Sequence, residues 1–165
     1  MIYGIIGNAQ QQKFYFEYQP EGFYKIMAMH TGKSITVQNN EIKKGTSIVQ
    51  YDYQGLDSQK WILRDSQKNG WIISPISNLE LAISIENEIQ NGSKLILDNE
   101  NSTDNQMMYI YNIKNQQKSK EDGIYKIANG IDSKKVIEVQ GASEQNNAII
   151  GIWDYRRRIA TKILF

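Results

Sequence analysis

Residues that could perform catalysis or bind a metal are scarce in this sequence. The 165 residues include no cysteine, which excludes disulfides, thiolate metal sites and cysteine nucleophiles. The only histidine, His30, lies in a polar turn segment, and without a second histidine or a cysteine it cannot form an ordinary zinc site. The sequence contains no nucleophile elbow and no glycine-rich phosphate loop. We therefore expect no enzyme, no metal site and no cofactor.

Two residues have the character of a binding site rather than of a catalytic site. Glu138 alternates with Ile137 and Val139, so its carboxylate lies on the opposite face of a predicted strand. Trp153 ends an apolar run just before a polar, basic segment, where its ring could serve as an exposed stacking platform. The simpler interpretations are a solvated strand carboxylate for Glu138 and core packing for Trp153.

The charge balance narrows the classes of partner. With 19 basic and 18 acidic residues, the chain has no electrostatic signature of a nucleic-acid or anionic membrane partner. No apolar run approaches the ~20 residues of a transmembrane helix. The first seven residues lack the basic start and the long apolar stretch of a signal peptide. We expect neither nucleic-acid binding nor membrane insertion.

A threefold internal repeat organises most of the chain. A glycine followed by an aromatic or aliphatic run at 22–26 returns at 70–73 and at 123–127. Three further short apolar runs follow in each unit, separated by clusters of Gly, Asn, Asp and Ser, which is typical of strands joined by turns. No window shows the apolar spacing of a helix. The sequence predicts an all-β chain with three four-stranded repeats, at about residues 19–66, 67–113 and 120–165.

The sequence contains four candidate closing strands, but three repeats offer only three positions for them. Phe14, Trp61 and Met108 are 47 residues apart, so residues 1–18 have the register of an extra half-repeat. This segment could complete the ring of strands, or pack outside it, or pair with a partner chain. We favour the outside position, because residues 161–165 already supply a closing strand for the third repeat. Trp61 and Trp71 are expected to pack in the core.

Three units of four strands, closing on Gln-x-aromatic or a variant of it, resemble the ricin-type β-trefoil, also called the ricin B-like lectin domain. The resemblance covers residues 22–165 and implies one β-trefoil domain over residues 1–165, a six-stranded barrel capped by three hairpins. The motifs that carry it are Gln59-Lys60-Trp61, Asn105-Gln106-Met107-Met108, Tyr51-Asp52-Tyr53-Gln54-Gly55, Val136-Ile137-Glu138-Val139 and Ile152-Trp153-Asp154-Tyr155.

The resemblance implies non-catalytic carbohydrate binding in a shallow pocket on each repeat. In the family pattern, an acid in the second strand accepts hydrogen bonds from sugar hydroxyls, and an aromatic at the end of the third strand stacks on the sugar. An amide in the third strand and an Asn-Gln pair before the closing aromatic support the site. The pattern assigns Glu138 and Trp153 to the third repeat and Tyr51 to the first. The positions that depart from it are Thr36, Val49 and Ser58 in the first repeat, Ala82, Ile96 and Asp98 in the second, and Gly151 and Ala160-Thr161 in the third.

The resemblance also implies a biological setting. Glycan partners of galactose type are expected, in a secreted, extracellular targeting domain of a larger bacterial protein such as a toxin, a haemagglutinin component or a glycoside hydrolase. The rival hypothesis is a degenerate trefoil that has lost sugar binding and acts as a protein-interaction or structural domain. The departures in the second repeat favour the rival, and Glu138 together with Trp153 favours the lectin.

Overall fold

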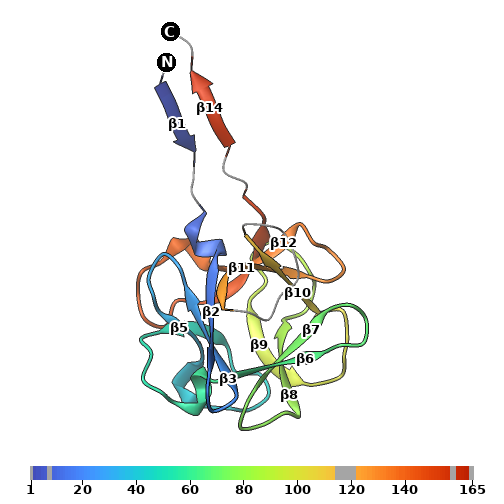
Figure 1. Ribbon diagram of the computed structural model, residues 1–165. Coiled ribbons are helices and arrows are strands. Elements are labelled where there is room, and N and C mark those ends of the chain that lie inside the picture. Colours follow the sequence, from blue (N-terminus) through green and yellow to red (C-terminus); the bar gives the residue numbers. More distant parts are fainter. Residues whose placement is uncertain (1, 7–8, 114–121, 157–158, 164–165) are drawn as a thin grey trace.

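The computed structural model describes residues 2–6, 9–113, 122–156 and 159–163, and it is built of strands and short 3-10 helices (Figure 1). The first repeat consists of β3 (Phe23–Ala28), β4 (Ser34–Val37), β5 (Ile48–Tyr51) and β6 (Trp61–Asp65). The second consists of β7 (Trp71–Pro75), β8 (Leu81–Ile85), β9 (Leu95–Asn99) and β10 (Met108–Asn112). The third contains β11 (Gly123–Asn129), β12 (Lys135–Val139) and β13 (Ile150–Asp154).

Six strands close into a barrel. Antiparallel pairing runs from β2 (Phe14–Gln19) to β3, β6, β7, β10 and β11, and β11 pairs again with β2. The hairpins β4–β5, β8–β9 and β12–β13 belong to the first, second and third repeats. A six-stranded barrel with one hairpin per repeat is a β-trefoil, so the predicted fold class is confirmed.

The barrel strands form because apolar and polar side chains alternate along them. In β2, Phe14 and Phe16 are buried whereas Tyr15 and Glu17 are only partly buried. Trp61 is fully buried, and its indole Nε1 donates a hydrogen bond to the Ile35 carbonyl at 3.0 Å. A core that closes on large aromatic side chains excludes water from all three repeats at once.

The position of the N-terminal segment differs from the favoured expectation. β2 completes the barrel, because Phe14 and Phe16 fill the core while the strand pairs with β3 on one side and β11 on the other. The C-terminal strand β14 (Ile159–Ile163) instead pairs with β1 (Ile2–Ile6). Figure 1 shows this two-stranded ribbon projecting away from the barrel. The expectation of an outside flap for residues 1–18 was therefore wrong for the strand that begins at Phe14.

The three hairpins interlock. Residues of each hairpin loop pair with the third strand of the neighbouring repeat, at Ser47 with Ile96, Lys94 with Gly151, and Ile149 with Val49. A left-handed residue lies two positions after the first strand of each hairpin: Asn39, Asn87 or Gly141, with φ of 55°, 58° and 65°. Asn and Gly adopt this conformation at little cost, so they set the turns that carry each hairpin into its neighbour. Short 3-10 helices flank these turns: η1 (Gln10–Gln12), η2 (Gln38–Asn40), η3 (Asp57–Gln59) and η4 (Gln140–Ala142).

Candidate functional site

The strand registers define equivalent positions on the three hairpins. Thr36 pairs with Val49 in the first repeat, and Glu138 pairs with Gly151 in the third. In the second repeat Ser84 pairs with Ile96. The acid position of the second repeat therefore belongs to Ser84, and its assignment to Ala82 was wrong. The residues on the same face two positions further along the third strand are Tyr51, Asp98 and Trp153.

A buried glutamine lies beneath each hairpin face. Gln12, Gln59 and Gln106 are each at most 1% exposed. The amide nitrogen of each donates to a carbonyl oxygen at the end of the third strand, and the amide oxygen of each accepts from a backbone N–H two residues further on. The carbonyls are those of Asp154 at 3.0 Å, Asp52 at 2.9 Å and Asn99 at 2.7 Å, and the N–H groups are those of Arg156, Gln54 and Asn101. These bonds tie the closing strand to the hairpin and offset the cost of burying an amide.

The third repeat takes its glutamine from the N-terminus. Gln12, rather than a residue of β14, occupies the position that Gln59 has in the first repeat. The assignment of Ala160-Thr161 to the Asn-Gln position was wrong, because β14 pairs with β1 outside the barrel. Gln12 is thus a candidate site residue that the motif comparison missed. The 47-residue spacing from Gln12 to Gln59 and to Gln106 is the signal that identifies them.

Glu138 is buried, not solvated. It is 4% exposed, and its Oε2 accepts a hydrogen bond from Gln12 Nε2 at 3.0 Å. Burial raises the pKa of Glu138, and the Gln12 hydrogen bond and the charge of Arg156 oppose that shift without cancelling it. Its other oxygen, Oε1, accepts no hydrogen bond from the residues that the structure describes. One carboxylate oxygen is therefore fixed by the fold and the other remains as an acceptor.

Trp153 lies on the same face of the β12–β13 hairpin as Glu138. Pairing places Trp153 opposite Val136 and Gly151 opposite Glu138, so carboxylate and indole are diagonal neighbours. The Trp153 ring is partly buried, and the Arg156 guanidinium lies 5.8 Å from its centroid. This arrangement brings together the two predicted residues of the third repeat.

Gly151 is required by the close approach of the neighbouring repeat. A Cβ atom at this position would come within 2.6 Å of the Ser93 carbonyl oxygen and 2.5 Å of Gln140 Nε2. The absence of an amide side chain at this position in the third repeat follows from that contact. The loop that carries Ser93 thus forms one wall beside Glu138 and Trp153.

The first repeat carries a pocket of about 250 Å³ at the equivalent position. Tyr51, the predicted aromatic, lies in its wall and is partly exposed. Ser58 is fully buried in the same wall, and its hydroxyl has no hydrogen-bond partner among the described residues. The remaining polar lining comes from Thr36, Asn39, Asn40, Gln54, Gln59 and Asn147.

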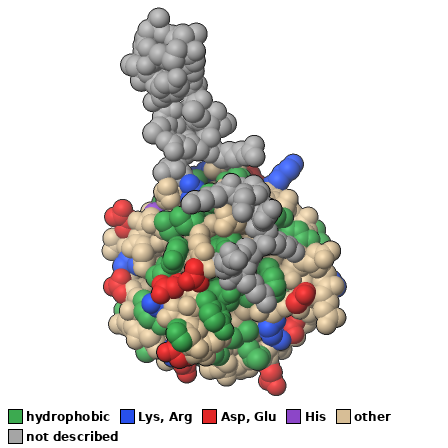
Figure 2. Space-filling view, viewed as in Figure 1, with side chains coloured by type: hydrophobic (Ala, Val, Ile, Leu, Met, Phe, Trp, Pro, Cys, Tyr) green, Lys and Arg blue, Asp and Glu red, His purple; other side chains and the backbone are tan. Residues whose placement is uncertain are grey.

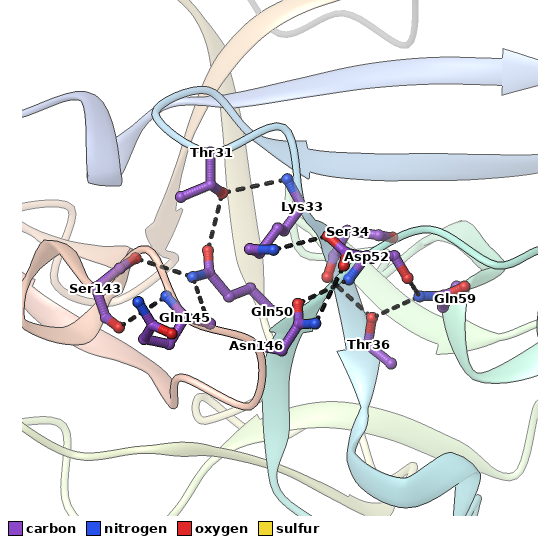
Figure 3. A network of polar contacts seen from close by, with 10 residues as sticks. All are labelled: Thr31, Lys33, Ser34, Thr36, Gln50, Asp52, Gln59, Ser143, Gln145 and Asn146. Carbon is purple, nitrogen blue, oxygen red and sulfur yellow. Dashed lines mark hydrogen bonds and ion pairs between the residues drawn. The ribbon is translucent and has the colours of Figure 1, made fainter.

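A polar network holds this pocket in shape (Figure 3). Thr36 Oγ1 accepts a hydrogen bond from Gln59 Nε2 at 3.1 Å and donates to the Ser34 carbonyl at 2.9 Å. The fully buried Gln50 bridges to the third repeat by donating to the carbonyls of Ser143 and Gln145 at 2.9 and 2.8 Å. The loop of the third repeat is therefore fixed against the first-repeat pocket.

Matching ion pairs flank the sites of the first and third repeats. Lys33 Nζ donates to Asp52 Oδ1 at 2.7 Å, and Asn146 donates to the other oxygen of Asp52 at 3.1 Å. The hydrogen bonds from Lys33 and Asn146 lower the pKa of Asp52. The third repeat repeats this set with Lys135, Asp154 and Asn91, and the same kind of bonds lower the pKa of Asp154. In the second repeat the corresponding pair is Leu81 opposite Asn99.

The second repeat lacks the features of a sugar site. Asp98 stands where an aromatic would stack, and it lies 3.3 Å from Lys44 Nζ. Asn105, the family's amide before the closing residue, is used internally, because its side chain donates to the carbonyls of Ile85 and Asn87 at 2.7 and 2.6 Å. This hairpin face is therefore engaged by Lys44 of the first repeat and by internal hydrogen bonds of Asn105.

Other chemistry finds no support in the part of the chain that the structure describes. His30 Nε2 lies 2.9 Å from the Ser143 carbonyl, which gives this histidine a structural contact between repeats. Among the described residues, no three acidic, cysteine or histidine side chains gather into a metal site. No helix within the described ranges is long and apolar enough to cross a membrane. On the face shown in Figure 2, acidic and basic side chains are interspersed.

A trefoil with buried glutamines tied to its hairpins belongs to the lectin-type class of β-trefoils. A family model described as ricin-type beta-trefoil lectin domain-like matches residues 10–98, more than half of the chain. The chain therefore belongs to the ricin-type β-trefoil lectin domain-like family. No curated protein is detectably similar to it in sequence.

Solved structures share the fold. The designed threefold symmetric protein ThreeFoil is 23% identical, with a TM-score of 0.70 over 88% of this chain and 91% of its own. The exo-beta-1,3-galactanase 1,3Gal43A from Clostridium thermocellum is 24% identical, with a TM-score of 0.72 over 84% of this chain and 28% of its own. A ricin B-like lectin from Macrolepiota procera, in complex with lactose, is 15% identical, with a TM-score of 0.65 over 93% of both chains.

Proposed function

We propose that the chain is a non-catalytic carbohydrate-binding module that binds galactose-type glycans through its first and third repeats. The observation that carries the proposal is the first-repeat pocket, where a stacking aromatic, Tyr51, faces several amides and the unpartnered hydroxyl of Ser58. A sugar offers an apolar face to such a ring and hydroxyls to such polar groups. The unpartnered hydroxyl gains a partner only when a ligand or water is present.

The third repeat supports the same function with different chemistry. Glu138 presents an ionisable acceptor beside the Trp153 ring, and Gln12 fixes the orientation of the carboxylate. Charge-assisted hydrogen bonds are stronger than neutral ones, so the third repeat is the tighter of the two sites. Each site alone is expected to bind a monosaccharide at roughly millimolar concentration, about 4 kcal/mol.

The proposal extends to the biological setting of the chain, with two similar solved structures as support. The galactanase includes a domain of this fold in only 28% of its chain, and the Macrolepiota lectin was solved with lactose. We place the present chain as an extracellular targeting module of a larger secreted protein, such as a toxin component or a glycoside hydrolase. Several weak sites in one chain would then raise avidity on a glycan-bearing surface.

A second function has one observation in its favour. The second repeat has Asp98 at the aromatic position and an internally bonded Asn105, so that face fits a structural or protein-binding role. A glycan array decides between the two functions. Binding of galactose-terminated glycans that weakens in Tyr51→Ala and Trp153→Ala supports the lectin. An array without a bound glycan favours the protein-interaction domain.

A further inference from the structure

A short segment of the first repeat separates two hollows. Residues 52–57 comprise the connection after β5 and the first residue of η3, and one side of the segment lines the first-repeat pocket described above. A second hollow of about 390 Å³ lies against the same segment, and its lining includes residues of the β2–β3 turn and Ile76 of the second repeat. Tyr53, Gly55 and Lys60 of this lining belong to motifs named above, but none of them was assigned a sugar contact. We call this second hollow the outer hollow.

Side chains of the connecting segment divide between the two hollows. Gln54 and Leu56 line the first-repeat pocket, whereas Tyr53, Gly55 and Asp57 line the outer hollow. At Gly55 the ridge between them carries no side chain, and a Cβ atom there would have no atom within 4 Å. A ligand that reached from the first-repeat pocket into the outer hollow would meet no side chain at Gly55.

The outer hollow has the composition of a second sugar-binding surface. Its lining includes the partly exposed ring of Tyr53 and the buried ring of Phe23, whose centroid lies 5.5 Å from Lys60 Nζ. Lys60 also lies 3.3 Å from the Asp57 carboxylate, so its charge is paired. Glu21, which is exposed, adds a second carboxylate. Lys25 Nζ lies 4.3 Å from the Tyr53 ring centroid and is itself 4.0 Å from the Glu17 carboxylate. The three carboxylates of this surface outnumber its two paired ammonium groups, so the hollow disfavours an anionic ligand.

The sizes of the two hollows agree with a ligand longer than one sugar. Small-molecule sites typically occupy about 300–1,000 Å³. The first-repeat pocket, at about 250 Å³, falls just below that range, whereas the outer hollow, at about 390 Å³, falls within it. A disaccharide or longer chain would use both.

We propose that the outer hollow binds the next residue of a neutral oligosaccharide whose terminal sugar occupies the first-repeat pocket. This inference rests on the proposed function, and it adds the substrate class: an uncharged glycan of two or more residues. Tyr53 supplies the stacking surface for the second residue. Asp57 and Glu21 select against a uronic acid or sialic acid at that position.

The test compares affinities for glycans of different length. Galactose and lactose are titrated into the full chain, together with a disaccharide that carries a uronic acid at the second position, and binding is followed by NMR shifts around Tyr51. Stacking on Tyr53 makes lactose bind about two- to tenfold more tightly than galactose. Tyr53→Ala brings this affinity ratio to about one. The matched control Tyr109→Ala, a partly buried tyrosine of the second repeat, keeps the wild-type ratio.

A second variant guards against a folding defect in Tyr53→Ala. Asp57→Asn changes only charge, and it narrows the gap in affinity between the neutral and the acidic disaccharide. Equal affinities for galactose and lactose in the wild-type chain, or an unchanged ratio in folded Tyr53→Ala, overturn the outer hollow while leaving the proposed function intact. Failure of the wild-type chain to bind galactose, lactose or the acidic disaccharide contradicts the proposed function itself.

Discussion

The first and third repeats share a frame but differ in the residue that faces a ligand. Both place a buried glutamine under the hairpin, and both pair a lysine with an aspartate at the end of the third strand. Above this common frame the first repeat has the neutral Thr36 and the third has the buried carboxylate of Glu138. The frame is thus a property of the repeat, whereas the chemistry depends on a single position of the second strand.

The largest expected effect is the loss of stability when the buried aromatic residue of the closing strand is truncated in either repeat. Phe14 and Trp61 occupy equivalent buried positions, so replacing either by alanine should lower the free energy of unfolding by about 3–5 kcal/mol. Urea titration measures the loss. Tyr15→Ala is the matched control, since Tyr15 lies on the same strand and is only partly buried. A loss below about 1 kcal/mol in Phe14→Ala would place β2 outside the barrel.

The next effect separates the chemistry of the two sites. Glu138→Gln removes a charge-assisted hydrogen bond to the sugar, and it should weaken binding at the third repeat by about 1.5–3 kcal/mol, roughly 10- to 150-fold. Binding at the first repeat should not change. Because glutamine matches the shape of glutamate and costs less to bury, urea stability should be retained. NMR titration with galactose reports both sites, and equal weakening at Tyr51 and Trp153 would refute the separation.

The pH dependence of sugar affinity should also differ between the two sites. Burial raises the pKa of Glu138, so its carboxylate becomes protonated at a higher pH than an ordinary glutamate. Sugar affinity at the third repeat should therefore fall as the pH is lowered through that pKa. The first repeat should hold its affinity over the same range, because the pKa of Asp52 is lowered and that carboxylate stays ionised. A parallel decline at both sites would contradict this difference.

The effect of Glu138 on folding stability should depend on pH in the opposite direction to its effect on sugar affinity. A folded-state pKa above the unfolded value means that the Glu138 contribution to stability is fully present at low pH and is lost as the pH rises through the folded pKa. In Glu138→Gln this contribution to the pH dependence disappears. Urea titrations of both proteins at several pH values measure it, and identical pH profiles would show that Glu138 has an ordinary pKa.

The smallest effect concerns the flanking ion pairs. Lys33→Ala should raise the pKa of Asp52 toward its ordinary range, and Lys135→Ala should do the same for Asp154. Stability should change little, because both aspartates are exposed and solvent screens such pairs. Carboxylate NMR titrations measure the two pKa values. A pKa shift in only one of the two variants would show that the flanking ion pairs of the two repeats are not equivalent.

Much of this organisation could be predicted from the sequence because it repeats. The spacing of apolar runs and glycines predicts three repeats of four strands. Trp61 is buried in the core, as expected. The last barrel position was predicted wrongly for β14 instead of β2, because both are short apolar strands and their long-range pairing energies are not visible in local patterns. Burial of Phe14 and Phe16 decided it.

The site was predicted less completely, for reasons of register. Glu138, Trp153 and Tyr51 were identified by position, but Gln12 comes from the opposite end of the chain, and only barrel closure brings it to Glu138. In the second repeat, strand pairing sets Ser84 rather than Ala82 opposite Ile96. A shift in register moves side chains relative to their partners and to the faces of the hairpin, so motif spacing alone does not fix them.

The central claim is that the first and third repeats are glycan sites built on one frame, while the second repeat is not. Titration of the isotopically labelled chain with lactose, followed through backbone amide shifts, tests it most directly. Saturable shifts are expected around Tyr51 and around Trp153, with none around Asp98. The absence of shifts at both aromatics, or shifts confined to Asp98, would contradict it.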